Sequence, residues 1–226
     1  MKKMFEKAAA AVFTPGEADA LRNLFFEFRI SHYHRQGMKK IRRLKWARPE
    51  KINLGCGDAL KEGFLNVDII PCGDLSLDLR RGLPFETECC DLIFSEHFFE
   101  HISYPETASR LLADCLRILR PGGVLRFSVP DTEWPLVDYA AGLSASYFEA
   151  CRVNSWHPAN CVTPLEHINY HFRQRQEHKY AYDEETATKL LKTIGFVDVH
   201  RGTFDRAIDS KHREAGSLIM VASKAR

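Results

Sequence analysis

The alternation of apolar and polar positions along the chain predicts an α/β protein. Short apolar runs, each the length of a buried strand, recur from residue 52 onward, and segments with apolar residues at helical spacing separate some of them. This alternation is typical of a parallel sheet with helices on its faces. Strands are expected at 52–54, 65–70, 75–79, 91–95, 124–129, 196–200 and 218–223, and helices at 107–119 and 183–195.

Residues 1–48 are predicted to form an N-terminal helical extension. Thr14, Pro15 and Glu17 have the pattern of a capping box with proline at the first helical position. An apolar stripe follows at helical spacing, at Leu21, Leu24, Phe25 and Phe28. We expect this helix to end near Gln36, with Gly37 as its stop. The extension would either pack against the rest of the protein or cover a ligand site as a lid.

Residues 132–180 show no clear period. Aromatic, histidine and proline residues gather there, at Trp134, Trp156, His157, Pro158, His167, Tyr170, His171 and Phe172. We expect an irregular insertion after the fifth strand, suited to shaping a substrate pocket. The predicted organisation is therefore a helical extension (1–48) and one domain (49–226) that carries 132–180 on its substrate side.

The composition favours a cytoplasmic protein. In 226 residues, 45% of them hydrophobic, there is enough apolar material for one core, and no run approaches the length of a membrane span. The start MKKMFEKAAAAVF resembles a secretory signal, but Glu6 and Lys7 interrupt it, so we expect a helical start without export. Seven cysteines without a C-x-x-C pair suit free thiols in a reducing compartment.

The net charge of +2 hides an asymmetry. Residues 1–48 hold 12 Lys and Arg against 4 Asp and Glu (+8), which leaves 20 against 26 (−6) for the remainder. The basic residues cluster at Lys39, Lys40, Arg42, Arg43, Lys45 and Arg48. This cluster could contact phosphate, nucleic acid or an anionic membrane, or it could be a solvated helix face. No nucleic-acid module accompanies it, so a stable nucleic-acid partner is not expected.

The candidate ligand site is the stretch KINLGCGDALKEGFLNVD at 51–68. A short strand runs into Gly55-Cys56-Gly57, and the next strand ends near Asp68. Glycines at a strand end let a ligand approach the backbone, and an acid on the neighbouring strand suits a ribose diol. The dinucleotide fingerprint is incomplete, because its third glycine is missing and Asp68 follows too soon for a crossover helix.

These residues resemble class I S-adenosylmethionine-dependent methyltransferases, most closely a bacterial small-molecule, type-11-like subgroup. The resemblance rests on LGCG, NVDI, DLRRGLPF (78–85), CDLIFSEHFFEHI (90–102) and LRILRPGGVLRFSVPD (116–131). It covers 51–131 densely and 180–223 more loosely. It implies a Rossmann-like sheet of seven strands with the last one antiparallel, and S-adenosyl-L-methionine as the cofactor.

The resemblance also implies which residues bind that cofactor. The glycine turn would pass under the methionine part, Asp68 would hold the ribose, and Asp78 with Leu79 would meet the adenine, with Asp74 as a rival in the same loop. Ser95, Glu96 and His97 would face the methionine end. The full predicted cofactor set is Leu54, Gly55, Cys56, Gly57, Val67, Asp68, Asp78, Leu79, Ser95 and Glu96.

The candidate catalytic residues are His97, Asp131 and His167. Methyl transfer needs alignment and a dry pocket above all, and an oxygen acceptor benefits from a base near neutral pH. The H-x-x-E-H pattern at 97–101 is also a zinc-protease motif in inverse order, but here it follows a strand directly instead of lying within a long helix. A second set, Cys151, His157, Cys161, His167 and His171, matches no known zinc spacing. No metal is expected at either.

The sequence therefore predicts a methyltransferase acting on a small or medium-sized acceptor, with O-methylation as the favoured chemistry. Two alternatives stay open at this stage. One is a nicotinamide-dependent oxidoreductase, and the other is a non-catalytic module that binds a partner or nucleic acid through its basic N-terminus. The identity of the acceptor and the oligomeric state do not follow from the sequence.

Overall fold

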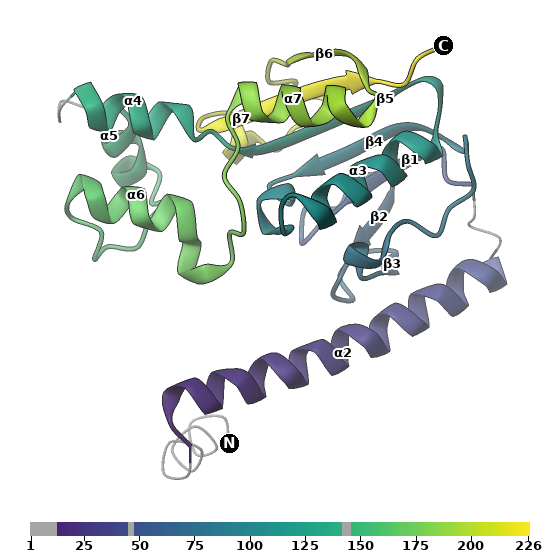
Figure 1. Ribbon diagram of the computed structural model, residues 1–226, viewed down its shortest axis with the longest axis horizontal. Coiled ribbons are helices and arrows are strands. Elements are labelled where there is room, and N and C mark those ends of the chain that lie inside the picture. The colour runs from purple at the N-terminus through teal and green to yellow at the C-terminus, as the bar shows by residue number, and fades with distance from the viewer. Residues whose placement is uncertain (1–12, 45–47, 142–145) are drawn as a thin grey trace.

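The computed structural model describes residues 13–44, 48–141 and 146–226 (Figure 1). The expected helical start within residues 1–12, and Lys45 of the basic cluster, lie outside these ranges. The helices are α2 (Pro15–Leu44), α3 (Glu106–Ile118), α4 (Glu133–Ala141), α5 (Ser146–Val153), α6 (Pro164–Arg173) and α7 (Glu184–Ile194). The strands are β1 (Lys51–Leu54), β2 (Leu65–Asp68), β3 (Leu75–Ser76), β4 (Cys90–Glu96), β5 (Leu119–Pro130), β6 (Val197–Arg201) and β7 (Ser217–Ser223). Short 3-10 turns are η1 (Leu79–Arg81), η2 (Phe99–His101), η3 (Gln174–Gln176) and η4 (Lys211–Arg213).

The seven strands form one sheet in the order β3-β2-β1-β4-β5-β7-β6. Strands β1 to β5 pair in parallel, whereas β7 lies antiparallel between β5 and β6. The predicted seven-stranded sheet with an antiparallel last strand is therefore confirmed. All seven predicted strands are present, although the third is shorter than expected and the fifth begins at Leu119 instead of residue 124. The third strand ends at Ser76 because the side chain of Asp78 accepts a hydrogen bond from the Arg80 N–H and turns the chain into η1.

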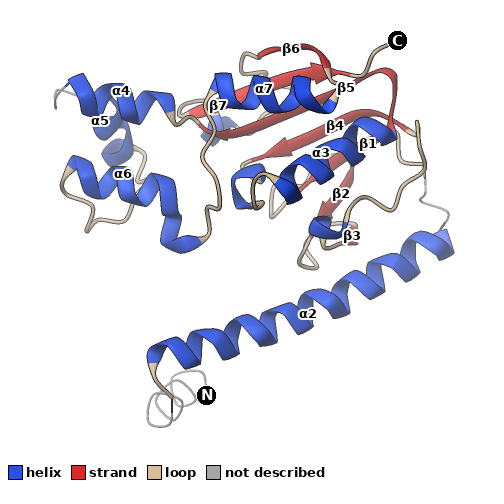
Figure 2. Cartoon of the chain, viewed as in Figure 1, coloured by secondary structure: helices blue, strands red, loops and turns tan. Residues whose placement is uncertain are grey.

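Helices α3 and α7 lie side by side over one face of the sheet (Figure 2). The connection between β1 and β2 contains no helix, as the short spacing before Asp68 predicted. Part of this connection covers the sheet instead. The ring of Phe64 lies 6.3 Å from that of Phe94 on β4, and the ammonium of Lys61 lies 4.6 Å from the Phe94 ring. The central strands are thus buried without a helix at this point.

Helix α2 passes through Gly37 and continues to Leu44, so the predicted end at Gln36 is wrong. Gly37 lies where α2 packs on β3, and a Cβ atom at this position would lie 2.2 Å from the carbonyl oxygen of Ser76. The glycine therefore permits a close approach within the helix. The predicted capping box is confirmed, because Thr14 N donates to the Glu17 carboxylate (2.8 Å) and Glu17 N donates to Thr14 Oγ1 (3.3 Å).

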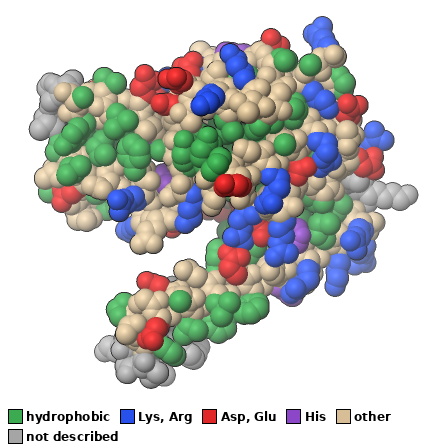
Figure 3. All heavy atoms as spheres, viewed as in Figure 1, with side chains coloured by type: hydrophobic (Ala, Val, Ile, Leu, Met, Phe, Trp, Pro, Cys, Tyr) green, Lys and Arg blue, Asp and Glu red, His purple; other side chains and the backbone are tan. Residues whose placement is uncertain are grey.

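The two halves of α2 have different surroundings. The C-terminal half carries Ile30 and Ile41, which are buried, and lies along β3. The N-terminal half extends away from the sheet, and its apolar side chains lie on the surface in Figure 3. The exposed ones are Leu21, Leu24, Phe25, Phe26 and Phe28. The predicted apolar stripe exists, but it does not pack against the domain.

The insertion at 132–180 was expected to be irregular and instead contains the three helices α4, α5 and α6. Its sequence does carry a helix signal. Thr163 and Glu166 form a capping box, with Pro164 at the first helical position of α6. A small separate core of Tyr147, Phe148 and Cys151 holds the helices together. Across the described ranges, no helix is both long enough and apolar enough to pass through a lipid bilayer.

Candidate active site

The glycine turn lies at the carboxyl end of β1 and is locked onto β2. The N–H groups of Gly55 and Cys56 both donate to the carbonyl of Val67, at 2.8 and 3.1 Å. Gly55 has a φ of +65°, and a Cβ there would lie 2.4 Å from the Phe98 ring. Gly57 has a φ of +47°, but a Cβ there would meet nothing within 4 Å. Of the two glycines, only Gly57 therefore presents open backbone to a ligand. The N–H groups of the turn already donate to Val67 and Asp68, so a cofactor carboxylate would have to share them with these acceptors.

Asp68 lies at the end of β2, directly beside the turn. Its Oδ2 accepts from Gly57 N (2.9 Å) and its Oδ1 from Ile70 N (3.1 Å). A carboxylate oxygen has a second lone pair, and the side chain is only half-buried. Asp68 can therefore still accept hydrogen bonds from a ribose diol, so the structure fits the predicted ligand at this position.

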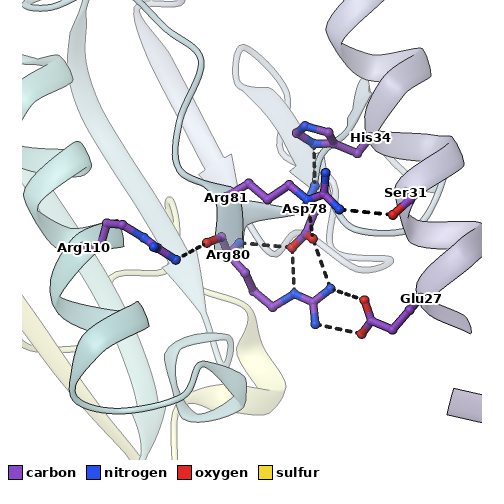
Figure 4. A network of polar contacts seen from close by, with 7 residues as sticks. All are labelled: Glu27, Ser31, His34, Asp78, Arg80, Arg81 and Arg110. Carbon is purple, nitrogen blue, oxygen red and sulfur yellow. Dashed lines mark hydrogen bonds and ion pairs between the residues drawn. The ribbon is translucent and has the colours of Figure 1, made fainter. Parts of the chain in front are cut away.

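Asp78 is buried and forms the centre of a polar network that reaches α2 (Figure 4). Its carboxylate accepts from Arg80 Nε (2.8 Å) and Arg81 Nε (3.2 Å). Arg80 also forms two 2.8 Å hydrogen bonds with Glu27, and Arg81 donates to Ser31. Burial acts to raise the pKa of Asp78, but hydrogen bonds and the charge of Arg80 hold it below its usual value. The predicted adenine-binding acid therefore anchors α2 in this structure.

The other predicted cofactor residues are largely engaged within the fold. Leu54, Val67, Leu79 and Ser95 are buried, and Ser95 Oγ donates to the Leu54 carbonyl at 3.0 Å. Glu96 accepts from Ser210 N and Ser210 Oγ, both at 2.7 Å, and pairs with Lys61 at 3.3 Å. The rival acid Asp74 accepts from Asn66 N at 2.8 Å. Glu96 and Asp74 thus hold loops in place.

His97 follows β4 with a φ of +47°, a region that a non-glycine residue rarely occupies and that is often found at functional sites. Arg213 donates to its Nδ1 at 2.9 Å, and its Nε2 lies 2.8 Å from Ser217 Oγ. A guanidinium can only donate, so Nδ1 carries a lone pair and Nε2 carries the proton. Burial, reinforced by the charge of Arg213, lowers the pKa of His97 well below its usual value.

A cavity of about 130 Å³ lies beside His97. It is bounded by the ends of β4, β5 and β7 and by the insertion, and its walls include five histidines and Arg213. The lining residues are His97, Pro130, Tyr147, Trp156, His157, Tyr170, His171, Gln174, His178, His212, Arg213, Ala215 and Gly216. Tyr147, His178 and Arg213 were not predicted as site residues. The only signal in the sequence is the clustering of basic residues around His178 and Arg213, and Tyr147 has no such signal.

The other two predicted catalytic residues, Asp131 and His167, are engaged in contacts within the fold. Asp131 caps α4 by accepting from Glu133 N (3.0 Å), and it pairs with Arg201 at 2.6 Å. His167 is buried, and its Nδ1 lies 2.8 Å from His157 Nδ1. His157 lines the cavity, but neither Asp131 nor His167 does. The structure thus brings only His97 of the three to the cavity, and the roles of all three stay predictions.

Glu100, four residues after the end of β4, is a buried acid that was not predicted as a site residue. Its side chain is 3% exposed, and Oε2 has no hydrogen-bond partner among the described residues. Burial raises its pKa to about 8. The signal in the sequence was the H-x-x-E-H pattern, which places Glu100 between two histidines on a short turn.

The comparisons with known proteins agree with this geometry. The family described as "Methyltransferase domain" matches residues 59–127. None of the curated proteins matches the chain. Several solved structures share the fold at low sequence identity, and three of them illustrate the range.

The first is the putative methyltransferase in complex with the Haloferax volcanii Trm112 methyltransferase activator (TM-score 0.51, 14% identity, 89% of this chain and 98% of that one). The second is phosphoethanolamine N-methyltransferase 2 of Haemonchus contortus in complex with S-adenosyl-L-methionine (0.48, 16%, 78% and 49%). The third is a SAM-dependent methyltransferase of Archaeoglobus fulgidus (0.45, 15%, 89% and 99%). The chain thus spans about half the length of the Haemonchus enzyme.

The family match, together with the strand order, shows that the chain carries a class I S-adenosylmethionine-dependent methyltransferase domain. This assignment replaces the nicotinamide-dependent alternative.

Proposed function

We propose that this methyltransferase domain transfers a methyl group to an oxygen atom of a small or medium-sized polar acceptor. The observation that carries the proposal is the cavity beside His97. It adjoins the end of β4, which is the neighbour of the strand that carries the glycine turn. Its imidazole, phenol and guanidinium groups are suited to hydroxyl and anionic oxygens, and its volume of about 130 Å³ suits a small group.

The residues that would hold the cofactor lie at or after the ends of β1, β2 and β3, which succeed one another in the sheet beside β4. Asp68 would bind the ribose, and the open backbone at Gly57 would lie under the methionine part. The adenine would lie near Asp78 and Leu79, beneath α2, which would make the N-terminal extension a cover over that end. When bound, S-adenosylmethionine supplies a methyl group on a sulfonium; transfer breaks the C–S bond, whose electron pair stays on sulfur, and forms a C–O bond.

His97 is the residue to which we assign the acceptor proton. Its neutral ring carries a lone pair on Nδ1, which at present accepts the hydrogen bond from Arg213. An anionic acceptor would draw Arg213 toward itself and release Nδ1. Asp131 and His167 would act more remotely, Asp131 by holding the end of β5 and His167 by orienting His157 on the cavity wall.

Ligand-dependent thermal unfolding tests the cofactor. Wild type, Asp68→Asn and the exposed loop variant Glu62→Gln would be heated with S-adenosylhomocysteine, S-adenosylmethionine or NAD. A ligand at a hundredfold excess over its Kd stabilises by about 2.7 kcal/mol, or roughly 2–4 °C for a domain of this size. We expect that shift with both S-adenosyl ligands in wild type and Glu62→Gln, and a much smaller one in Asp68→Asn. A shift with NAD alone would contradict the assignment.

Product analysis tests the acceptor atom. Release of S-adenosylhomocysteine would be measured with hydroxylated, amine and carboxylate compounds, and the methylated product would be identified by NMR. We expect an O-methyl product, and a lower kcat for His97→Gln with little change in the Kd of S-adenosylhomocysteine. An N-methyl or C-methyl product would overturn the oxygen acceptor and leave the cofactor assignment intact.

A further inference from the structure

Three potential metal ligands meet next to the cavity beside His97, and one of them, His178, lines it. They are a carboxylate oxygen of Glu100 and one ring nitrogen each of His101 and His178, and all three atoms lie within 4.8 Å of one another. We propose that Glu100, His101 and His178 bind a divalent first-row transition-metal cation. Glu100 and His101 come from η2, whereas His178 lies far along the chain, near the end of the insertion.

Both imidazoles are held in the orientation that a metal ligand needs. Nδ1 of His101 lies 3.2 Å from the carbonyl oxygen of Glu177, and Nδ1 of His178 lies 2.8 Å from the carbonyl oxygen of His171. A carbonyl only accepts, so each Nδ1 carries the proton and each Nε2 carries a lone pair. A backbone carbonyl on Nδ1 is the usual way in which a protein orients a histidine ligand.

The side chain of Glu100 faces two imidazole nitrogens that carry lone pairs, and the charge of Arg213 also acts on it. Its Oε1 lies 3.8 Å from His101 Nε2 and 3.6 Å from His97 Nδ1. The first nitrogen is unprotonated, and the second accepts its hydrogen bond from Arg213. Oε2 has no hydrogen-bond partner among the described residues, so part of the hydrogen-bonding capacity of this buried acid is unmet. A cation at the centre of the three ligand atoms would satisfy all of them.

The segments that carry the ligands are fixed to each other. The N–H groups of Lys179 and Tyr180 donate to the Glu100 carbonyl at 2.7 and 3.2 Å. The ring of Tyr180 stacks on that of Tyr104, with the centroids 4.0 Å apart and an interplanar angle of 18°. His178 is therefore placed beside η2 by the backbone itself, which lowers the entropic cost of bringing the ligands together.

The ligand set indicates the class of metal and the purpose of the site. Two histidines and one carboxylate suit Zn²⁺, Co²⁺ or Fe²⁺, and three protein ligands leave a position open, as in catalytic sites. His178 also lines the cavity, so the open position would face the acceptor. This role rests on the proposed function. There the cation would bind the acceptor hydroxyl and lower its pKa, so that its proton passes more readily to His97 as the C–O bond forms.

A second cluster is the main competitor for a metal. The ligand atoms of Cys151, His157 and His167 also lie within 4.8 Å of one another. His157 already uses Nδ1 toward His167 (2.8 Å), and its Nε2 faces Cys151 Sγ at 3.9 Å. These groups satisfy each other without a cation, whereas Oε2 of Glu100 has no hydrogen-bond partner among the described residues. A third cluster, Cys56, Asp68 and Cys72, surrounds the acid expected at the ribose.

Calorimetric titration of the whole chain with Zn²⁺, after removal of metals by a chelator, tests the proposal. The variants are Glu100→Gln and His178→Gln, with Cys151→Ser for the competing cluster. The matched control is His200→Gln, because Nδ1 of His200 also faces a backbone carbonyl (2.7 Å to Asp198) but the side chain is exposed. We expect one equivalent bound in wild type, Cys151→Ser and His200→Gln. Affinity should fall by at least about a hundredfold in Glu100→Gln and His178→Gln.

The visible spectrum of the Co²⁺ form identifies the ligands independently. Nitrogen and oxygen ligands give weak bands, and a thiolate adds intense charge transfer. Wild-type affinity in Glu100→Gln, an intense band that Cys151→Ser abolishes, or no stoichiometric binding would each overturn the site. Circular dichroism and S-adenosylhomocysteine binding show whether each variant is folded. If Glu100→Gln is not folded, the metal affinity of His178→Gln tests the site instead. Since the titration needs no acceptor, failure of the proposed function would leave its result unaffected.

Discussion

The guanidinium of Arg213 donates a hydrogen bond to Nδ1 of His97 across 2.9 Å. The two residues are 116 positions apart in the chain, and η4 brings them together at the cavity. The contact sets the tautomer of His97 and places a permanent positive charge beside it. The candidate base and the anion-binding group of the cavity are therefore a single unit.

Removing this charge should raise the pKa of His97. Burial is the main cause of its low pKa, and the charge of Arg213 is the second. We expect Arg213→Met to move the pKa upward without restoring its ordinary value. An NMR titration of the ring protons, assigned with His97→Gln, measures the shift. The exposed Arg206→Met is the control, and an unchanged pKa in Arg213→Met would mean that burial acts alone.

Alanine at two positions of α2 should have opposite effects on stability. At Gly37 a Cβ would lie 2.2 Å from the Ser76 carbonyl, whereas at Gly16 nothing lies within 4 Å. Gly37→Ala should destabilise by about 1–3 kcal/mol through overpacking against β3, although alanine is the better helix former. Gly16→Ala should be neutral or stabilising by up to about 1 kcal/mol. Urea unfolding measures both, and equal effects would contradict the close approach.

The two glycines of the turn should separate stability from binding. Gly55→Ala introduces a clash with the Phe98 ring as well as backbone strain, so we expect a marked loss of stability. Gly57→Ala carries only the cost of its positive φ, about 1–2 kcal/mol, but its methyl group would occupy the open side of the turn. We expect Gly57→Ala to weaken S-adenosylhomocysteine in calorimetry much more than it lowers the melting temperature. Unaltered affinity would mean that the ligand does not approach there.

Acid should destabilise the insertion through His171. Burial, with a smaller effect of His178, lowers its pKa from 6.5 to about 4 in the folded protein. Between these values the unfolded chain binds a proton that the folded chain does not, so stability falls as the pH falls from 6.5 toward 4. A group shifted this far contributes roughly 1–3 kcal/mol over that window.

Chemical unfolding of wild type and His171→Gln across this pH range measures the effect. The variant should show a shallower loss of stability toward pH 4, and the exposed His200→Gln should follow wild type. Identical slopes in wild type and His171→Gln would show that other groups set the acid sensitivity.

Local signals were sufficient for most of the fold. The capping box at Thr14, the cap of α7 at Asp183 with its stop at Gly195, and the buried run of β4 each act within a few residues, so the sequence displays them directly. The insertion was harder. Its helices α4 and α5 are short and lack a clear apolar period, although the capping box at Thr163 was readable.

The sequence by itself determined the succession of the seven strands with α2, α3 and α7, the turn at Gly55 and Gly57, and the acid at Asp68, because glycine conformation and strand patterning are local properties. Only the tertiary structure decided how the remaining polar residues are used. Arg80 links Asp78 to Glu27 of α2, Asp131 pairs with Arg201, and Glu100 meets His178. In each case one partner comes from a distant segment. Such pairings depend on which loops the sheet brings to one edge, and no spacing along the chain encodes them.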